Sequence, residues 1–137
     1  MTLYVTEADV AGLVGMDDAI GALEGAFLQW GRAGTTNLPR RRLALPDRAV
    51  NIMAAALPEA DVYGHKVYSR GSFLFSLYSI SERRLLAIIQ ANHLGALRTG
   101  AASGVATRLL ARAGAASVGL IGCGGRGTGA TANCVES

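Results

Sequence analysis

The sequence has few residues of several informative kinds. Its 137 residues include only two cysteines, three prolines and one lysine, and 17% of them are charged. Cys123 and Cys134 are too few, and too late in the chain, to form a disulfide framework. No uninterrupted apolar run approaches the roughly 20 residues of a membrane-spanning helix. The N-terminal stretch also lacks the basic and apolar regions of a signal peptide. We therefore expect a soluble, cytoplasmic protein with no membrane partner.

Charge and composition narrow the class further. The net charge of +3 is too small for a dedicated nucleic-acid binder, so no nucleic-acid partner is expected. No group of His, Cys, Asp and Glu has the spacing of metal ligands, so no metal site is predicted. Half of the residues are hydrophobic, which favours a globular chain with a buried core over a disordered one.

The hydrophobic pattern predicts helices at both ends of a strand-rich segment. Thr6 can cap the first helix, and Ile20, Leu23, Phe27 and Trp30 form an apolar stripe that we expect to pack in the core of the second. Closely spaced strands joined by short turns imply an antiparallel or mixed sheet, so an α/β chain is expected. The predicted helices span residues 6–15, 16–34 and 92–112. The predicted strands span residues 3–5, 41–45, 50–57, 62–69, 73–80 and 85–90.

A glycine-rich turn follows a further apolar segment. Residues 117–121 have the composition of a strand, and Gly122, Gly124 and Gly127 come directly after it. Such a turn lets backbone N–H groups meet a pyrophosphate at the start of a helix. The ribose-binding acid expected about 20 residues later is absent, because the sequence stops 10 residues after Gly127. The pattern therefore fits either a nucleotide site or a glycine-rich terminal loop.

Basic side chains stand at three positions where they could bind an anion. Arg40, Arg41 and Arg42 open a strand, and alternation sends Arg41 to the face opposite the other two. This run suits a solvated strand edge, or a pocket in which one arginine binds a carboxylate. Lys66 stands between apolar and aromatic residues, so it is either partly buried with a lowered pKa or exposed on the polar face. Arg98 precedes a run of small residues, which leaves room for an anion or simply marks an amphipathic helix surface.

Together these segments resemble the ornithine cyclodeaminase/μ-crystallin family, which also contains alanine dehydrogenases and ketimine reductases. The most specific match is Leu97-Arg98-Thr99, within the stretch NHLGALRTGAA at residues 92–102. The other matching stretches are PRR at 39–41, YGHKV at 63–67 and VGLIGCG at 118–124.

The resemblance implies a role for each candidate residue. Arg41 and Arg98 would clamp the α-carboxylate of the substrate. Lys66 would be both a substrate-binding and a catalytic residue, near the substrate nitrogen or carbonyl. The implied contacts to the cofactor, NAD or NADP, are Thr99, Gly122 and Gly124.

The resemblance also implies a domain organisation and an activity. Residues 1–113 would form an α+β substrate-binding and dimerisation domain with a mixed sheet. Residues 114–137 would begin a Rossmann domain, which we expect to be truncated. The full-length enzyme would be a homodimer that carries out NAD(P)-dependent deamination, reduction or cyclisation of a small amino acid or imino acid. The alternative is a catalytically inactive fragment or a non-enzymatic amino-acid-binding module.

Overall fold

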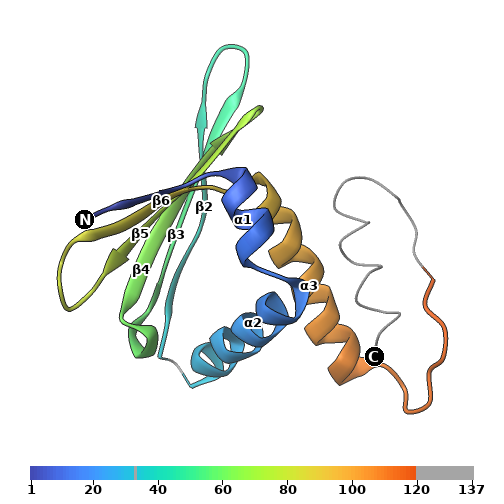
Figure 1. Cartoon of the computed structure of the whole chain (residues 1–137). Coiled ribbons are helices and arrows are strands. Elements are labelled where there is room, and N and C mark those ends of the chain that lie inside the picture. Colours follow the sequence, from blue (N-terminus) through green and yellow to red (C-terminus); the bar gives the residue numbers. More distant parts are fainter. Residues whose placement is uncertain (33, 120–137) are drawn as a thin grey trace.

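Three helices lie on one side of a six-stranded sheet in the computed structural model, which describes residues 1–32 and 34–119 (Figure 1). The strands are β1 (Leu3–Val5), β2 (Thr36–Ala44), β3 (Ala49–Leu57), β4 (Val62–Ser69), β5 (Ser72–Ser79) and β6 (Leu85–Gln90). The three helices are α1 (Glu7–Leu13), α2 (Met16–Gly31) and α3 (Asn92–Leu110), and a short 3₁₀ helix, η1 (Pro58–Ala60), lies between β3 and β4 in the chain.

The sheet is mixed, as the sequence predicted. Its strand order is β1-β6-β5-β4-β3-β2. β1 runs parallel to β6, and every other neighbouring pair is antiparallel. Antiparallel neighbours need only short turns, and Gly71 supplies a positive φ of 82° in the turn between β4 and β5. The α/β class expected from the sequence is therefore confirmed for the described residues.

The first two helices begin at the predicted positions because local hydrogen bonds cap them. The N–H of Thr6 donates to Asp9 Oδ2 at 2.9 Å, and the N–H of Asp9 donates to Thr6 Oγ1 at 3.3 Å, which completes a capping box. The N–H of Gly15 donates to Asp18 Oδ2 at 3.0 Å at the start of α2. These bonds satisfy backbone donors that a helix leaves unpaired at its first turn.

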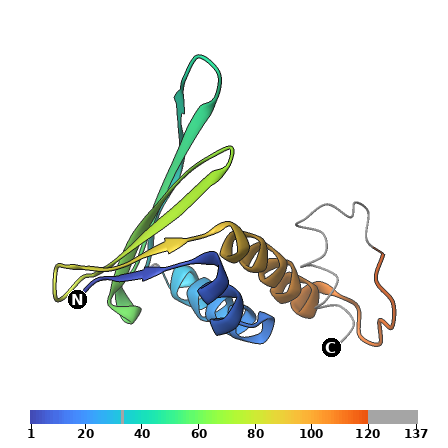
Figure 2. The ribbon, with the colours of Figure 1, turned by 45° about the horizontal axis from the view of Figure 1, so that its top comes forward.

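The buried core joins α2 to α3, which lie side by side (Figure 2). Ile20 and Leu23 of the predicted stripe pack against this cluster. Phe27 and Trp30 do not, since they are 41% and 56% exposed, and the prediction that they pack in the core is wrong. The helical pattern is correct, but burial also needs an opposing element, and the core cluster includes only the first half of the stripe. The cluster is centred on Ala19, Leu97 and Ala101.

The last described segment departs from the sequence prediction. Residues 117–119 form no strand, and Val118 is 49% exposed. A parallel strand needs a hydrogen-bonded neighbour, and the sheet in the described part of the chain offers none to this segment. Leu120 and Ile121, the rest of the predicted strand, lie outside the described residues. Across the described ranges, no helix is long and apolar enough to cross a membrane.

Candidate functional site

The inner face of β4, which is turned toward the helices, carries the lysine singled out by the sequence. Alternation along the strand places Gly64, Lys66 and Tyr68 on this face. A Cβ at Gly64 would lie 2.6 Å from Phe75 Cζ and 2.8 Å from the carbonyl oxygen of Ser76. Any side chain at this position would therefore force β5 to shift, because this strand passes too close to Gly64.

The first half of α3 carries two more predicted site residues, Arg98 and Thr99, and hydrogen bonds to α1 hold the start of this helix. The carboxylate of Glu7 in α1 accepts the N–H groups of Asn92 and His93 at 2.7 and 2.9 Å. Partial burial alone would raise the pKa of Glu7, but the backbone N–H groups of His93 and Asn92 hold it below its usual value. The helix start is thus fixed by a charge-assisted cap from a neighbouring helix.

A glycine in the first turns of α3 brings an aromatic ring close to the helix. A Cβ at Gly95 would lie 3.3 Å from Phe73 Cζ, so the absent side chain lets the ring of β5 approach. Thr99 lies one turn later and donates its hydroxyl proton to the carbonyl oxygen of Gly95 at 2.7 Å. In this arrangement the Thr99 oxygen can accept a hydrogen bond but has no free proton to donate.

A β-bulge in β2 decides which arginine of the basic run faces the helices. Leu38 pairs with Ala54, whereas Arg41 pairs with Ile52, so two residues of β2 lie opposite the single residue Met53. Arg40, one of these two, shares the inner face with Met53 and lines the cavity there. Arg41 pairs with Ile52, which in turn pairs with Val67, and this row lies on the opposite face of the sheet from Lys66.

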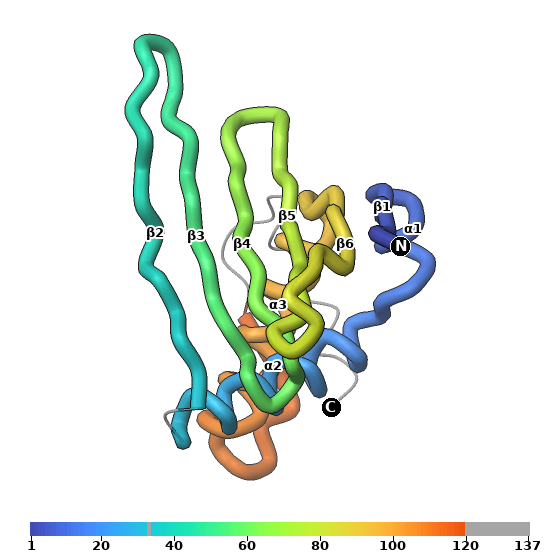
Figure 3. Tube along the Cα trace, turned by 90° about the vertical axis from the view of Figure 1, so that its left-hand side faces the viewer, coloured from blue at the N-terminus to red at the C-terminus, as the bar shows by residue number. Residues whose placement is uncertain are grey.

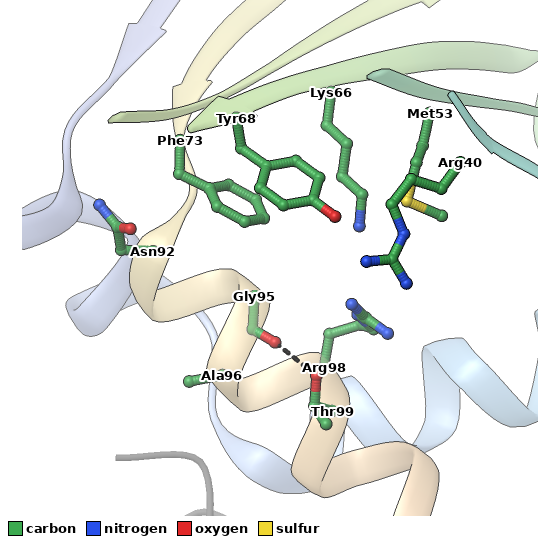
Figure 4. Close-up of a pocket in the computed structure, with 10 residues that line it drawn as sticks. All are labelled: Arg40, Met53, Lys66, Tyr68, Phe73, Asn92, Gly95, Ala96, Arg98 and Thr99. Carbon is green, nitrogen blue, oxygen red and sulfur yellow. Dashed lines mark hydrogen bonds between the residues drawn. The ribbon is translucent and has the colours of Figure 1, made fainter. Parts of the chain in front are cut away.

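The three cations Arg40, Lys66 and Arg98 meet at one cavity of about 550 Å³, called here the cationic cavity (Figure 4). Figure 4 shows the charged ends of these side chains turned toward the same space, one from β2, one from β4 and one from α3. The remaining lining residues are Met53, Tyr68, Phe73, Asn92, Gly95, Ala96 and Thr99.

The electrostatics of the cationic cavity favour an anion. Burial lowers the pKa of the Lys66 ammonium below its usual value, and the positive charges of Arg98 and then Arg40 lower it further. The ammonium nitrogen also lies 5.6 Å from the ring centroids of both Tyr68 and Phe73. The lining contains no acidic residue, and the ion pairs found in the described ranges involve none of the three cations. A bound carboxylate would supply the missing negative charge, with two guanidinium groups available to hold it.

The structure brings together three of the six site residues that the sequence predicted. Lys66, Arg98 and Thr99 line the cationic cavity. The predicted convergence of Arg41 with Lys66 and Arg98 is corrected, because the bulge turns Arg41 to the other face of the sheet and gives its place to Arg40. The predicted cofactor contacts Gly122 and Gly124 lie outside the described residues.

Sequence reasoning missed several residues of the cavity. Tyr68 is predictable from strand period, since it follows Lys66 by two residues and shares its face. Phe73 and Met53 could not be found in this way, because their places depend on how β5 and β3 pair with β4.

Comparisons with known proteins show the family of the chain. Residues 1–136 match a family model described as "Ornithine cyclodeaminase/mu-crystallin family". The chain is 32% identical over 132 residues to alanine dehydrogenase of Archaeoglobus fulgidus, a match covering 90% of this chain and 41% of that protein. It is 31% identical over 136 residues to iminosuccinate reductase of Paracoccus denitrificans, covering 89% of this chain and 42% of that protein. The chain thus spans about two fifths of the length of these relatives.

Solved structures show the same fold over their matching part. A probable ornithine cyclodeaminase from Bordetella pertussis superimposes with a TM-score of 0.89 at 31% identity, over 97% of this chain and 44% of that one. An archaeal alanine dehydrogenase, described as a dimer with bound NAD, gives a TM-score of 0.88 at 29% identity, over 98% of this chain and 44% of that one.

Proposed function

The chain belongs to the ornithine cyclodeaminase/mu-crystallin family, and we propose that residues 1–113 bind the carboxylate of a small amino acid or imino acid for an NAD(P)-dependent enzyme. The observation that carries this proposal is the meeting of Arg40, Lys66 and Arg98 at one cavity whose lining holds no acid. The reaction class is deamination, reduction or cyclisation, since the similar proteins include an alanine dehydrogenase, an iminosuccinate reductase and a probable ornithine cyclodeaminase.

Each cation has a distinct part in the proposed chemistry. Arg40 and Arg98 hold the carboxylate, because planar guanidinium groups bind it bidentately and fix its orientation. Lys66 lies beside the substrate nitrogen or carbonyl and transfers a proton there. Its lowered pKa suits this role, since a lysine that releases its proton more readily is a better acid near neutral pH.

The cofactor, NAD or NADP, supplies hydride transfer at the α-carbon when it is bound. Thr99 is the proposed contact within the described residues, and its oxygen keeps lone pairs free to accept a hydrogen bond. Gly122 and Gly124, in residues 114–137, are the proposed contacts to the pyrophosphate, at the start of the Rossmann domain.

The face of the sheet that the helices leave uncovered is the proposed dimer interface (Figure 3). The strand registers place several exposed hydrophobic side chains on this face, in adjoining rows. They are Leu38, Leu43, Ile52, Tyr63, Val67 and Leu74. A contiguous apolar patch of this kind marks an interaction surface.

Val67→Glu places a charge at the centre of this patch and is expected to convert a homodimer to monomer in sedimentation velocity. A dimer that persists in this variant would place the interface elsewhere.

Calorimetric titration with pyruvate tests the carboxylate site. Pyruvate is a stable 2-oxo analogue of an imino acid, and the 137-residue chain is expected to bind it. Arg98→Met should weaken binding by at least tenfold, because a hydrogen bond to a charged group is lost. Arg108→Met is the matched control, since Arg108 lies on the same helix but pairs with Glu24 at 3.3 Å. Equal affinities of both variants would refute the proposed site.

Cofactor absorbance then separates the enzyme from the binding module. Reductive amination of pyruvate with ammonia, or reduction of a cyclic ketimine, with NADH or NADPH as the hydride donor would show that the chain is catalytic. Binding without any turnover would support the alternative of an amino-acid-binding module.

A further inference from the structure

A second cavity, called here the apolar cavity, lies beside the cationic cavity and has a volume of about 440 Å³. The two cavities share Lys66, Phe73, Gly95 and Arg98. Lys66 and Arg98 thus line both cavities, and Figure 4 shows their charged ends turned into the cationic cavity. A ligand held by its carboxylate would have the apolar cavity within immediate reach.

Small residues on α2 create this space. Ala19, Ala22 and Ala26 line it on the helix side, at positions three and four apart along one face. Leu57 and Phe75 line it on the sheet side. Ligand pockets are concave and mostly apolar with a few polar groups that orient the ligand, and an apolar hollow next to a charged site fits this description.

We propose that the apolar cavity receives the side chain of the ligand whose carboxylate lies in the cationic cavity. The substrate is then an amino or imino acid with an aliphatic side chain of several carbons, not a diamino acid. This inference rests on the proposed function, because it takes the carboxylate site as the anchor.

The charges around the apolar cavity disfavour a terminal ammonium group. Lys66 and Arg98 stand at its border with the cationic cavity and would repel a second positive charge. The one acidic residue of its lining is Asp18, and Oδ2 of Asp18 already accepts the N–H of Gly15 at 3.0 Å as part of the α2 cap. An aliphatic chain, in contrast, gains free energy by leaving water for this lining.

The first experiment is a calorimetric series on the 137-residue chain. The ligands are pyruvate, 2-oxobutanoate, 2-oxopentanoate and 2-oxohexanoate, which differ by one methylene at each step. Affinity should rise roughly fourfold per methylene, the value for full burial of each group. L-Norvaline should also bind more tightly than L-ornithine, which has the same carbon chain with a terminal ammonium. A flat series, or tighter binding of L-ornithine, would overturn the inference.

The second experiment fills the apolar cavity. Ala26→Leu, with Ala22→Leu as a second variant, should abolish the rise in affinity along the series and leave pyruvate binding within about twofold of the unmodified chain. Gly21→Leu is the matched control, because a Cβ at this exposed position of α2 meets no atom within 4 Å. Variants that retain the rise would overturn the inference. Circular dichroism and urea unfolding check that each variant is folded.

Failure of this inference is distinct from failure of the proposed function. If pyruvate binds and Arg98→Met weakens it, but the series is flat, the carboxylate site stands and the side-chain pocket is wrong. If none of these carboxylates binds, both are refuted.

Discussion

Replacing Arg40 and Arg41 by methionine, one at a time, tests the placement of the carboxylate site. The two arginines are neighbours in sequence and are both exposed, but only Arg40 lines the cationic cavity. Arg41 lies in a row with Ile52 and Val67 on the other face of the sheet. Because the residue types and positions are so nearly matched, each variant serves as the control for the other.

The expected difference follows from the interactions that each side chain can make. Arg40→Met removes hydrogen bonds to a charged carboxylate, each worth about 1.5–3 kcal/mol, so pyruvate affinity should fall about 10- to 150-fold. Arg41→Met leaves these bonds intact. Its charge acts from across the sheet and through solvent, where salt screens charges beyond a Debye length of about 8 Å at physiological ionic strength. Its affinity for pyruvate should stay within about twofold of the unmodified chain.

Isothermal titration calorimetry gives both dissociation constants, and the urea midpoint of each variant shows whether its fold is intact. The assignment of Arg40 to the carboxylate site would be refuted if Arg41→Met lost as much affinity as Arg40→Met. It would also be refuted if both variants bound as tightly as the unmodified chain. Either result would mean that the bulge of β2 does not select the ligand arginine.

Three further predictions concern stability. Lys66→Met should raise the urea midpoint at neutral pH, because the lysine pKa lies below its ordinary 10.5 and charging the partly buried amine therefore opposes folding. The same variant should weaken pyruvate binding, because it removes one cation of the cationic cavity. In the unmodified chain stability should rise as pH increases from the lowered pKa toward 10.5, and this rise should vanish in the variant. Glu7→Ala should reduce the free energy of unfolding by about 1 kcal/mol at neutral pH, through loss of the α3 cap. The N–H groups of α3 stabilise only the ionised form of Glu7, so part of the stability of the unmodified chain is lost as the pH falls below 4.5. This loss should be smaller in Glu7→Ala, and an unchanged dependence of stability on pH below 4.5 would contradict the prediction. Gly64→Ala should cost about 1–3 kcal/mol in urea unfolding, because the new methyl would lie 2.8 Å from the carbonyl oxygen of Ser76, and an unaltered midpoint would show that β5 can move away.

Much of the fold could be predicted from the sequence because its signals are local. Capping side chains, strand period and turn residues act over a few positions, and they placed β4, β6 and the start of α2 within a residue of the structure. Lys66 and Arg98 stood out for the same reason, as a lone lysine within a strand and an arginine beside small helical residues. The family resemblance, carried by contiguous motifs, was confirmed by the match over residues 1–136.

Local sequence signals therefore suffice for the order and type of the α-helices and of the strands of the sheet, and for two of the three cations of the cationic cavity. Only the tertiary structure decided the third cation, because the bulge that selects Arg40 over Arg41 exists in the pairing of β2 with β3 and not in β2 alone. It also decided that Phe27 and Trp30 stay exposed, since burial requires an opposing surface that a helical pattern cannot specify. The cavities also depend on the tertiary structure: the cationic cavity lies between the sheet and α3, the apolar cavity between the sheet, α2 and α3, and both are lined by side chains from distant parts of the chain.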